Sequence, residues 1–193
     1  MIPPYRDAGQ AFPIYITVVA GLLFLALAYL AVGQAAVNRS SAQTAADAAA
    51  LAAAQKTRDQ LAGKWVDDVR DPTKWRALFE GDGGDDFCWR AGQLAEQNGA
   101  TAHCAFRPPL SYVVDARTVK PVGDSVVPGT GNVHATAHAT AVIEPLCEAP
   151  DQTVKGNGLP PLICKDKVWK LNPDDTTGLP KPEDLFDVHL ADS

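Results

Sequence analysis

Charge is missing from one long stretch near the N-terminus, where no Asp, Glu, Lys or Arg lies between Asp7 and Arg39. Within it, the apolar run from Ile14 to Val32 is long enough to cross the ~30 Å hydrocarbon layer of a bilayer as a helix. We therefore predict a transmembrane helix over residues 11–37. A cleaved signal peptide is the alternative, because the small-residue sequence AVG follows, but the apolar run exceeds the ~7–15 residues of a typical signal.

Proline is absent from residues 14–71, and the segment NRSSAQTAADAAALAAAQ after the apolar run is rich in alanine, the residue with the highest helix propensity. We expect the membrane helix to continue through residues 38–65, with Gly63 as the first residue that favours a stop. Small side chains let another backbone approach closely. The helix-packing residues predicted from this pattern are Ala46, Asp47, Ala50, Leu51 and Ala54.

Cysteine is absent before residue 88, and the four cysteines that follow include no C-x-x-C or C-x-x-H pair of the kind that holds zinc. We therefore predict disulfides rather than a metal centre. Of the three possible pairings we favour Cys88 with Cys104 and Cys147 with Cys164, because each closes a short local loop, and the sequence leaves the other pairings open. Four reduced, buried thiols in a cytoplasmic domain are the alternative.

The predicted disulfides decide the topology, because Lys and Arg are too evenly placed around the apolar run to orient it. Disulfides form and persist in oxidising compartments. We expect a single-pass protein of the cell membrane, with residues 1–10 in the cytoplasm and the C-terminal domain extracellular. The lipid bilayer is its first expected partner.

Residues 66–147 predict a small α+β domain. Asp71 before a proline is typical of a helix N-terminus, and this short helix should extend through Phe79. A second helix is predicted over residues 87–98, where Gly99 would stop it. The strand candidates that follow are residues 101–106, 111–119 and 132–145.

The third strand candidate, NVHATAHATAVIEP, alternates small apolar residues with His134, Thr136, His138 and Thr140. A period of two favours a strand over a helix. A strand face built of alanine packs only against an element that comes very close. We hypothesise that the alanine-rich helix, or the helix after Cys88, lies across a small antiparallel sheet. The predicted fold class is α+β: one N-terminal transmembrane helix extended into a long alanine-rich helix, plus a small, disulfide-tied antiparallel sheet domain.

Residues 148–193 differ in character, being rich in Pro, Gly and Asp. They predict an irregular C-terminal extension with a possible edge strand at residues 168–171. From Asn172 onward we expect little fixed structure, with PEDLFDVHL as a candidate docking segment.

Catalytic and cofactor motifs are scarce. There is no G-x-x-x-x-G-K-[ST] and no G-x-G-x-x-G loop. The sequence GDSV could present Ser125 as a nucleophile with Asp187 and His189 as partners, but VVPG follows it instead of a helix, and Asp187 and His189 are two residues apart rather than three. The sequence therefore predicts no enzymatic activity, no cofactor and no small-molecule substrate.

Metal and nucleic-acid sites are not predicted either. His134 and His138 lie about 13 Å apart in a strand, too far to share an ion. The loop GDGGDD at residues 81–86 lacks calcium-loop spacing and predicts a flexible acidic turn. The net charge of −6 argues against nucleic acid as a partner.

Four segments together resemble the actinobacterial TadE/TadG-like proteins linked to Tad (Flp) pilus assembly: GQAFPIYITVVAGLLFLALAYLAVGQAAV, QTAADAAALAAA, LAEQNGA and GDSVVPGTGNVHATAHATAVIEP. The likeness covers residues 7 to about 147. It implies a membrane-anchored, pilin-like or pseudopilin-like structural component whose partners are other pilus-assembly subunits or membrane helices.

One position departs from the prepilin pattern: the residue five after Gly9 is Ile14, where prepilins carry glutamate. This departure argues against processing by a prepilin peptidase. The alternative to a pilus role is a single-pass membrane protein with an extracellular binding or sensing domain unrelated to pili.

Overall fold

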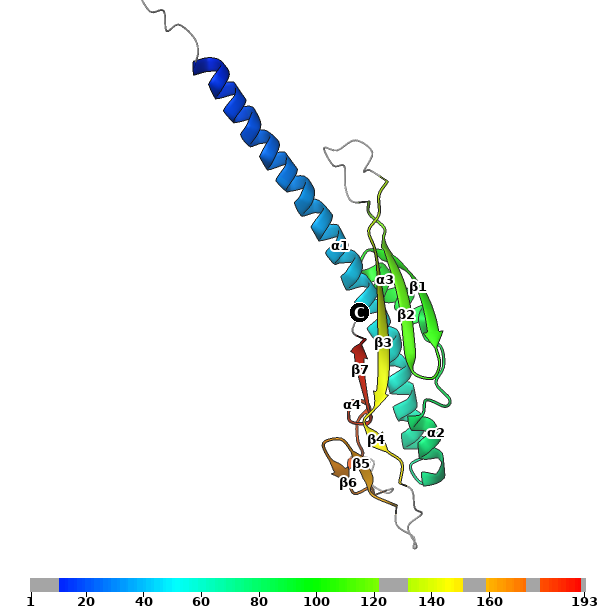
Figure 1. Cartoon of the computed structure of the whole chain (residues 1–193). Coiled ribbons are helices and arrows are strands. Elements are labelled where there is room, and N and C mark those ends of the chain that lie inside the picture. The colour runs from blue at the N-terminus through cyan, green and yellow to red at the C-terminus, as the bar shows by residue number, and fades with distance from the viewer. Residues whose placement is uncertain (1–10, 122–131, 151–158, 173–177, 192–193) are drawn as a thin grey trace, which may run out of the picture.

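A single long helix dominates the architecture. The computed structural model describes residues 11–121, 132–150, 159–172 and 178–191. Helix α1 runs unbroken from Ala11 to Asp67 and is about 85 Å long at 1.5 Å per residue. Its N-terminal half projects beyond the rest of the protein, and its C-terminal half lies against a sheet (Figure 1).

Gly63 does not end α1, which continues to Asp67, two residues beyond the expected end at residue 65. The position is exposed, and nothing lies near enough for packing there to depend on the missing side chain. Trp65, two residues later, is fully buried. Burial of that large side chain offsets the ~1 kcal/mol by which glycine disfavours a helix, so the helix continues for another turn.

Four antiparallel strands form the main sheet, in the order β1-β2-β3-β7. The strands are β1 (Ala100–Arg107), β2 (Ser111–Thr118), β3 (Thr136–Pro145) and β7 (Phe186–Leu190). Helix α3 (Cys88–Gln97) packs beside α1 and against β1. The two helices cover one face of the sheet, and the polar residues of the opposite face remain exposed or half-buried.

Alanine meets alanine where α1 crosses the sheet. On the strands, Ala139 and Ala141 of β3 and Ala116 of β2 are buried, and they belong to one core with the buried alanines of α1. Because neither surface carries long side chains, the helix and strand backbones can come close. The hypothesis that the alanine-rich helix lies across the sheet therefore agrees with the structure.

Two aromatic pairs close the far end of this core. A turn of 3-10 helix, η1 (Pro72–Lys74), leads into the short α2 (Trp75–Phe79), and the Asp71 side chain accepts a hydrogen bond from the Thr73 backbone. Trp75 packs on Trp65 with ring centroids 5.5 Å apart, and Phe79 packs on Phe186 at 5.7 Å. These distances are typical of favourable aromatic contacts.

A second, smaller sheet lies at the end of the domain away from the projecting helix (Figure 1). It contains β4 (Cys147–Glu148), β5 (Leu162–Cys164) and β6 (Val168–Trp169) in antiparallel order. The predicted edge strand at residues 168–171 is thus present in shorter form.

Both disulfides have the predicted pairing, Cys88 with Cys104 and Cys147 with Cys164. The first joins α3 to β1, and the second joins β4 to β5. The bonded cysteines are 16 and 17 residues apart, so chain-entropy estimates assign each bond about 3 kcal/mol of stabilisation.

The expectation of little fixed structure after Asn172 is wrong for residues 178–191. Helix α4 (Pro182–Leu185) leads directly into β7, which pairs with the second half of β3. Phe186 is fully buried, and Val188 and Leu190 follow it on the same face. These alternating apolar residues supply the driving force for docking, so the C-terminal extension completes the main sheet.

Candidate membrane anchor and stem

The N-terminal half of α1 is an apolar surface with nothing packed against it. An 18-residue window within this helix has a mean hydropathy of 2.4, and none of it is buried. Large apolar side chains are widely exposed, including Phe24 at 71%, Tyr29 at 82% and Leu30 at 58%. We call residues 12–37 the anchor segment. An exposed apolar surface of this extent is rare on a monomeric soluble protein and marks a membrane or protein interaction site.

Polar groups in and near the anchor segment bond within the helix. The Thr17 hydroxyl donates to the carbonyl of Pro13, and Ser41 donates to the carbonyl of Val37 at 2.9 Å. Such bonds to the carbonyl four residues earlier satisfy hydroxyl groups that have no water nearby. The helix is therefore long enough and apolar enough to cross a bilayer, and these two hydroxyl groups find hydrogen-bond acceptors within it.

The next part of α1, residues 42–65, is a stem whose buried face consists of alanine from Ala42 to Ala54 and then includes Thr57, Leu61 and Trp65. The fully buried alanines are Ala42, Ala45, Ala46, Ala49, Ala50, Ala53 and Ala54. They recur every three or four residues, so they form one continuous stripe along the helix. Of the predicted packing residues, three alanines lie in this stripe, whereas Asp47 and Leu51 are half-buried beside it.

Hydrogen bonds of the Gln43 side chain connect Asp47 to the main sheet. The Gln43 side-chain amide donates to Asp47 Oδ1 at 2.8 Å and to the backbone carbonyl of His138 at 3.3 Å. In the main sheet β7 pairs only with residues 141–145 of β3, so His138 lies on a part of β3 that β7 does not reach. Asp47 therefore orients an amide that caps a strand edge to which no other described strand is paired.

A buried polar cluster locks the stem to the acidic loop at residues 81–86. The Tyr112 hydroxyl lies 2.7 Å from Thr57 Oγ1, donates to the Asp85 carbonyl at 3.1 Å and accepts from the Phe87 backbone at 3.0 Å. Gln60 on α1 also bonds the Asp85 backbone, at 2.9 Å. The loop expected to be a flexible acidic turn is thus held by side chains from α1 and β2.

The environment of Tyr112 favours its neutral form. Burial raises the pKa of the phenol above its ordinary value, and the hydrogen bonds with Thr57 and Phe87 oppose that shift without cancelling it. Because the hydroxyl both donates and accepts, only the protonated phenol supports the whole cluster. Tyr112 was not singled out from the sequence, since its period-two position in β2 indicates burial but not hydrogen-bond partners.

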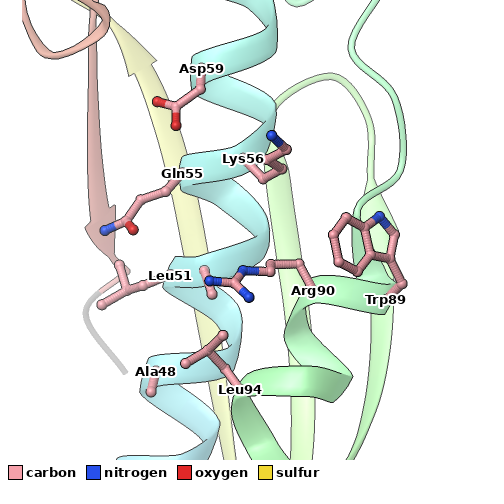
Figure 2. Close-up of a pocket in the computed structure, with 9 residues that line it drawn as sticks. Ala48, Leu51, Gln55, Lys56, Asp59, Trp89, Arg90 and Leu94 are labelled. Carbon is pink, nitrogen blue, oxygen red and sulfur yellow. The ribbon is translucent and has the colours of Figure 1, made fainter.

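A shallow groove of about 590 Å³ runs between the stem and α3. Figure 2 shows Leu51, Gln55 and Asp59 projecting from α1, and Trp89, Arg90 and Leu94 from α3. Trp89 is 61% exposed, which is unusual for so large an apolar side chain. The groove thus combines side chains of both helices with an exposed aromatic residue.

The residues with catalytic or metal-binding side chains do not form one site, although Asp187 and His189 lie next to each other. Ser125 lies outside the described residues, whereas Asp187 and His189 lie exposed on β7. His134 is half-buried and its Nδ1 lies 2.7 Å from the Thr118 carbonyl, while His138 is exposed on β3. The structure therefore does not bring His134 and His138 into one site.

The anchor segment and the first part of the stem match a known protein family. Residues 9–56 match the TadE/G-like Flp pilus-assembly family, Tad. The N-terminal helix is TadE/G-like. The match spans the anchor segment and the alanine-rich part of the stem, and it supports an association with Flp pilus assembly. Neither the curated proteins nor the solved structures contain a significant match to the chain.

Proposed function

We propose that this chain is a membrane-anchored, pseudopilin-like structural component of Flp pilus assembly. The single observation that carries the proposal is the division of one unbroken helix, α1, into an unburied apolar half and a half packed on its own sheet. The TadE/G-like match covers the junction between the two halves. Such a helix holds a folded domain at a fixed position above a membrane.

The proposed topology follows from the disulfides. Both bonds lie in the domain after the anchor segment, and disulfides persist in oxidising compartments. We infer that residues 1–10 face the cytoplasm and that the domain from residue 66 onward faces outward. The bilayer is then the partner of the anchor segment.

Neighbouring subunits would contact the anchor segment rather than the alanine stripe of the stem. Ala46, Ala50 and Ala54 are fully buried within the chain's own core and offer no surface to another helix. The anchor segment instead exposes Gly21 and Gly33, and no described residue outside their own helix packs against either position. Small residues of this kind let helices approach closely in a bilayer.

Deletion of the gene in a piliated host tests the proposal. We expect surface pili, counted by electron microscopy, to be lost on deletion and restored by the full chain. Restoration should fail with Leu23→Arg combined with Leu27→Arg, because each arginine costs ~2.5–3.5 kcal/mol at the centre of a membrane helix. The matched control, Leu23→Ala with Leu27→Ala, should restore pili. Unchanged pilus counts after deletion would contradict a role in assembly.

The intact mass of the chain, measured separately in membranes and in sheared filaments, distinguishes an anchored assembly factor from a filament subunit. Full-length chain found only in membranes supports an anchored assembly factor, in keeping with Ile14 at the position where prepilins carry glutamate. A shortened chain in filaments supports a filament subunit. Labelling of four thiols before reduction would contradict the outward-facing topology.

The groove in Figure 2 favours a second candidate, recognition of another protein by an ectodomain unrelated to pili. Its exposed Trp89 is the type of residue that dominates binding energy at interfaces. Under this candidate, Trp89→Ala would abolish co-purification of the partner from membranes, and deletion of the gene would leave pili intact.

A further inference from the structure

Two carboxylates and an imidazole meet on the open face of the main sheet. Glu144 of β3 is paired in register with Asp187 of β7, and His189 follows two residues later on the same face of β7. Strand pairing therefore fixes which residues are neighbours. All three side chains are exposed on the face that α1 and α3 do not cover.

The three side chains converge at their polar ends. A carboxylate oxygen of Glu144, a carboxylate oxygen of Asp187 and a ring nitrogen of His189 all lie within 4.8 Å of one another. The His189 Nδ1 lies 3.0 Å from Asp187 Oδ2. Each residue thus offers one ligand atom to the same small volume.

This arrangement places two carboxylates side by side, and the neighbouring His189 imidazole is positively charged only when it is protonated. Like charges placed directly opposite each other on neighbouring strands are destabilising. Among the described residues, no lysine or arginine forms an ion pair with Glu144 or Asp187. Lys165 borders the adjacent hollow beside Glu144 without pairing with it. A cation between the two carboxylates would relieve their repulsion.

We propose that Glu144, Asp187 and His189 form a binding site for a divalent transition-metal ion, with zinc as the ion that the ligand set suits. Zinc is bound by imidazole nitrogen and carboxylate oxygen at about 2.0–2.2 Å. Calcium and magnesium prefer sets made entirely of oxygen, which the imidazole does not match. Three protein ligands leave a fourth position open to water or to a group from outside the chain.

The observed separations are close to those that zinc requires. Ligand atoms in a tetrahedral zinc site lie about 3.4 Å apart, as follows from the bond lengths. The side chains are exposed, so small rotations about their χ angles would bring the ligand atoms from within 4.8 Å to that separation. The backbone does not need to move.

The site would join the last strand of the chain to the rest of the sheet. Among the described strands β7 pairs only with β3, and the two carboxylates come from opposite sides of that pairing. An ion that binds only the folded state stabilises it by mass action. Zinc would therefore clamp the C-terminal strand in place, a property independent of any role in pilus assembly.

Titration of the full-length chain in detergent micelles with zinc chloride tests the proposal, using an affinity tag that contains no histidine. Isothermal calorimetry should give one equivalent of bound zinc for the unmodified chain. Both Glu144→Gln and His189→Ala should weaken the affinity by about tenfold or more. His138→Ala is the matched control, because His138 is also exposed on β3 but lies outside the cluster, and its affinity should be unchanged.

A second measurement guards against misfolded variants. The thermal midpoint without zinc should be close to that of the unmodified chain for all three variants, and added zinc should raise it only in the unmodified chain and in His138→Ala. The proposal is overturned if the unmodified chain takes up no zinc at millimolar concentration. It is also overturned if Glu144→Gln and His189→Ala bind as tightly as the unmodified chain, or if His138→Ala binds as weakly as they do.

Discussion

At the scale of single residues, the Tyr112 hydroxyl links β2 to α1 and to the loop that precedes α3. It bonds to Thr57 on α1 and to both ends of the segment from Asp85 to Phe87. Tyr112→Phe leaves these buried groups short of a partner, so we expect it to lower the free energy of unfolding by about 1–3 kcal/mol. Urea unfolding in micelles, followed by the fluorescence of buried Trp65 and Trp75, measures the change. Tyr29→Phe, in the anchor segment, is the matched control and should change nothing.

The same residue predicts a loss of stability in alkali. Because the folded state raises the pKa of Tyr112, chiefly by burial, its contribution is fully present below the ordinary tyrosine pKa of about 10. The contribution is lost as pH rises through the higher folded-state pKa. We expect the unmodified chain to lose stability more steeply than Tyr112→Phe as pH is raised above about 10. Parallel curves for the two proteins would show that Tyr112 does not titrate in this way.

Single residues also show what sequence can and cannot predict. The disulfide pairing was predictable because short loops favour local closure, and Cys88 with Cys104 follows that rule. The link from Asp47 through Gln43 to the His138 carbonyl was not, because it joins residues far apart in the chain through a bond to backbone. Hydrophobic periodicity carries no information about which carbonyl a side chain will meet.

At the scale of elements, the alanine stripe sets how close α1 lies to the sheet. Ala50 is fully buried, so Ala50→Leu forces extra carbon atoms between helix and strand. We expect it to cost about 1–3 kcal/mol through overpacking. Ala36→Leu makes the same change at an exposed position of the anchor segment and should leave the thermal midpoint of the outer domain unchanged. Equal midpoints for the two variants would contradict close packing at Ala50.

Strand β7 is one of the elements that the sequence does not predict, and its contribution is measurable. Phe186 is fully buried and packs on Phe79, so Phe186→Ala should cost about 3–5 kcal/mol. Trp89→Ala removes an exposed aromatic side chain and serves as the control. If both variants unfold at the same urea concentration, β7 does not contribute to the core.

The sequence did contain the pattern of β7, in the alternation of Phe186, Val188 and Leu190 with Asp187 and His189. The strand is short, and it follows a region rich in proline and aspartate that predicts irregular structure. By contrast, the alternation in β3 extends over twice the length and was recognised. Docking of β7 depends on a partner strand distant in sequence, which local composition does not reveal.

At the scale of the whole molecule, anchor and domain share one helix without a hinge in the described residues. No proline interrupts α1 after Pro13, and the alanine-rich stem has the highest helix propensity. Under the proposed function, the helix itself rather than a linker would position the domain relative to the membrane. The anchor segment was predictable from sequence, because a membrane-spanning helix requires only sufficient length and apolar side chains.

Because α1 is unbroken, it fixes the direction in which the outer domain faces, about the helix axis, relative to the anchor segment. One alanine inserted between Arg39 and Ser40 would turn the domain by about 100° relative to the anchor segment, whereas seven would raise it by about 10 Å and return it to within ~20° of its original direction. If neighbours recognise both parts at once, the seven-residue insertion should preserve more pili than the one-residue insertion. The stem would then set the direction in which the outer domain faces, as well as its height above the anchor segment.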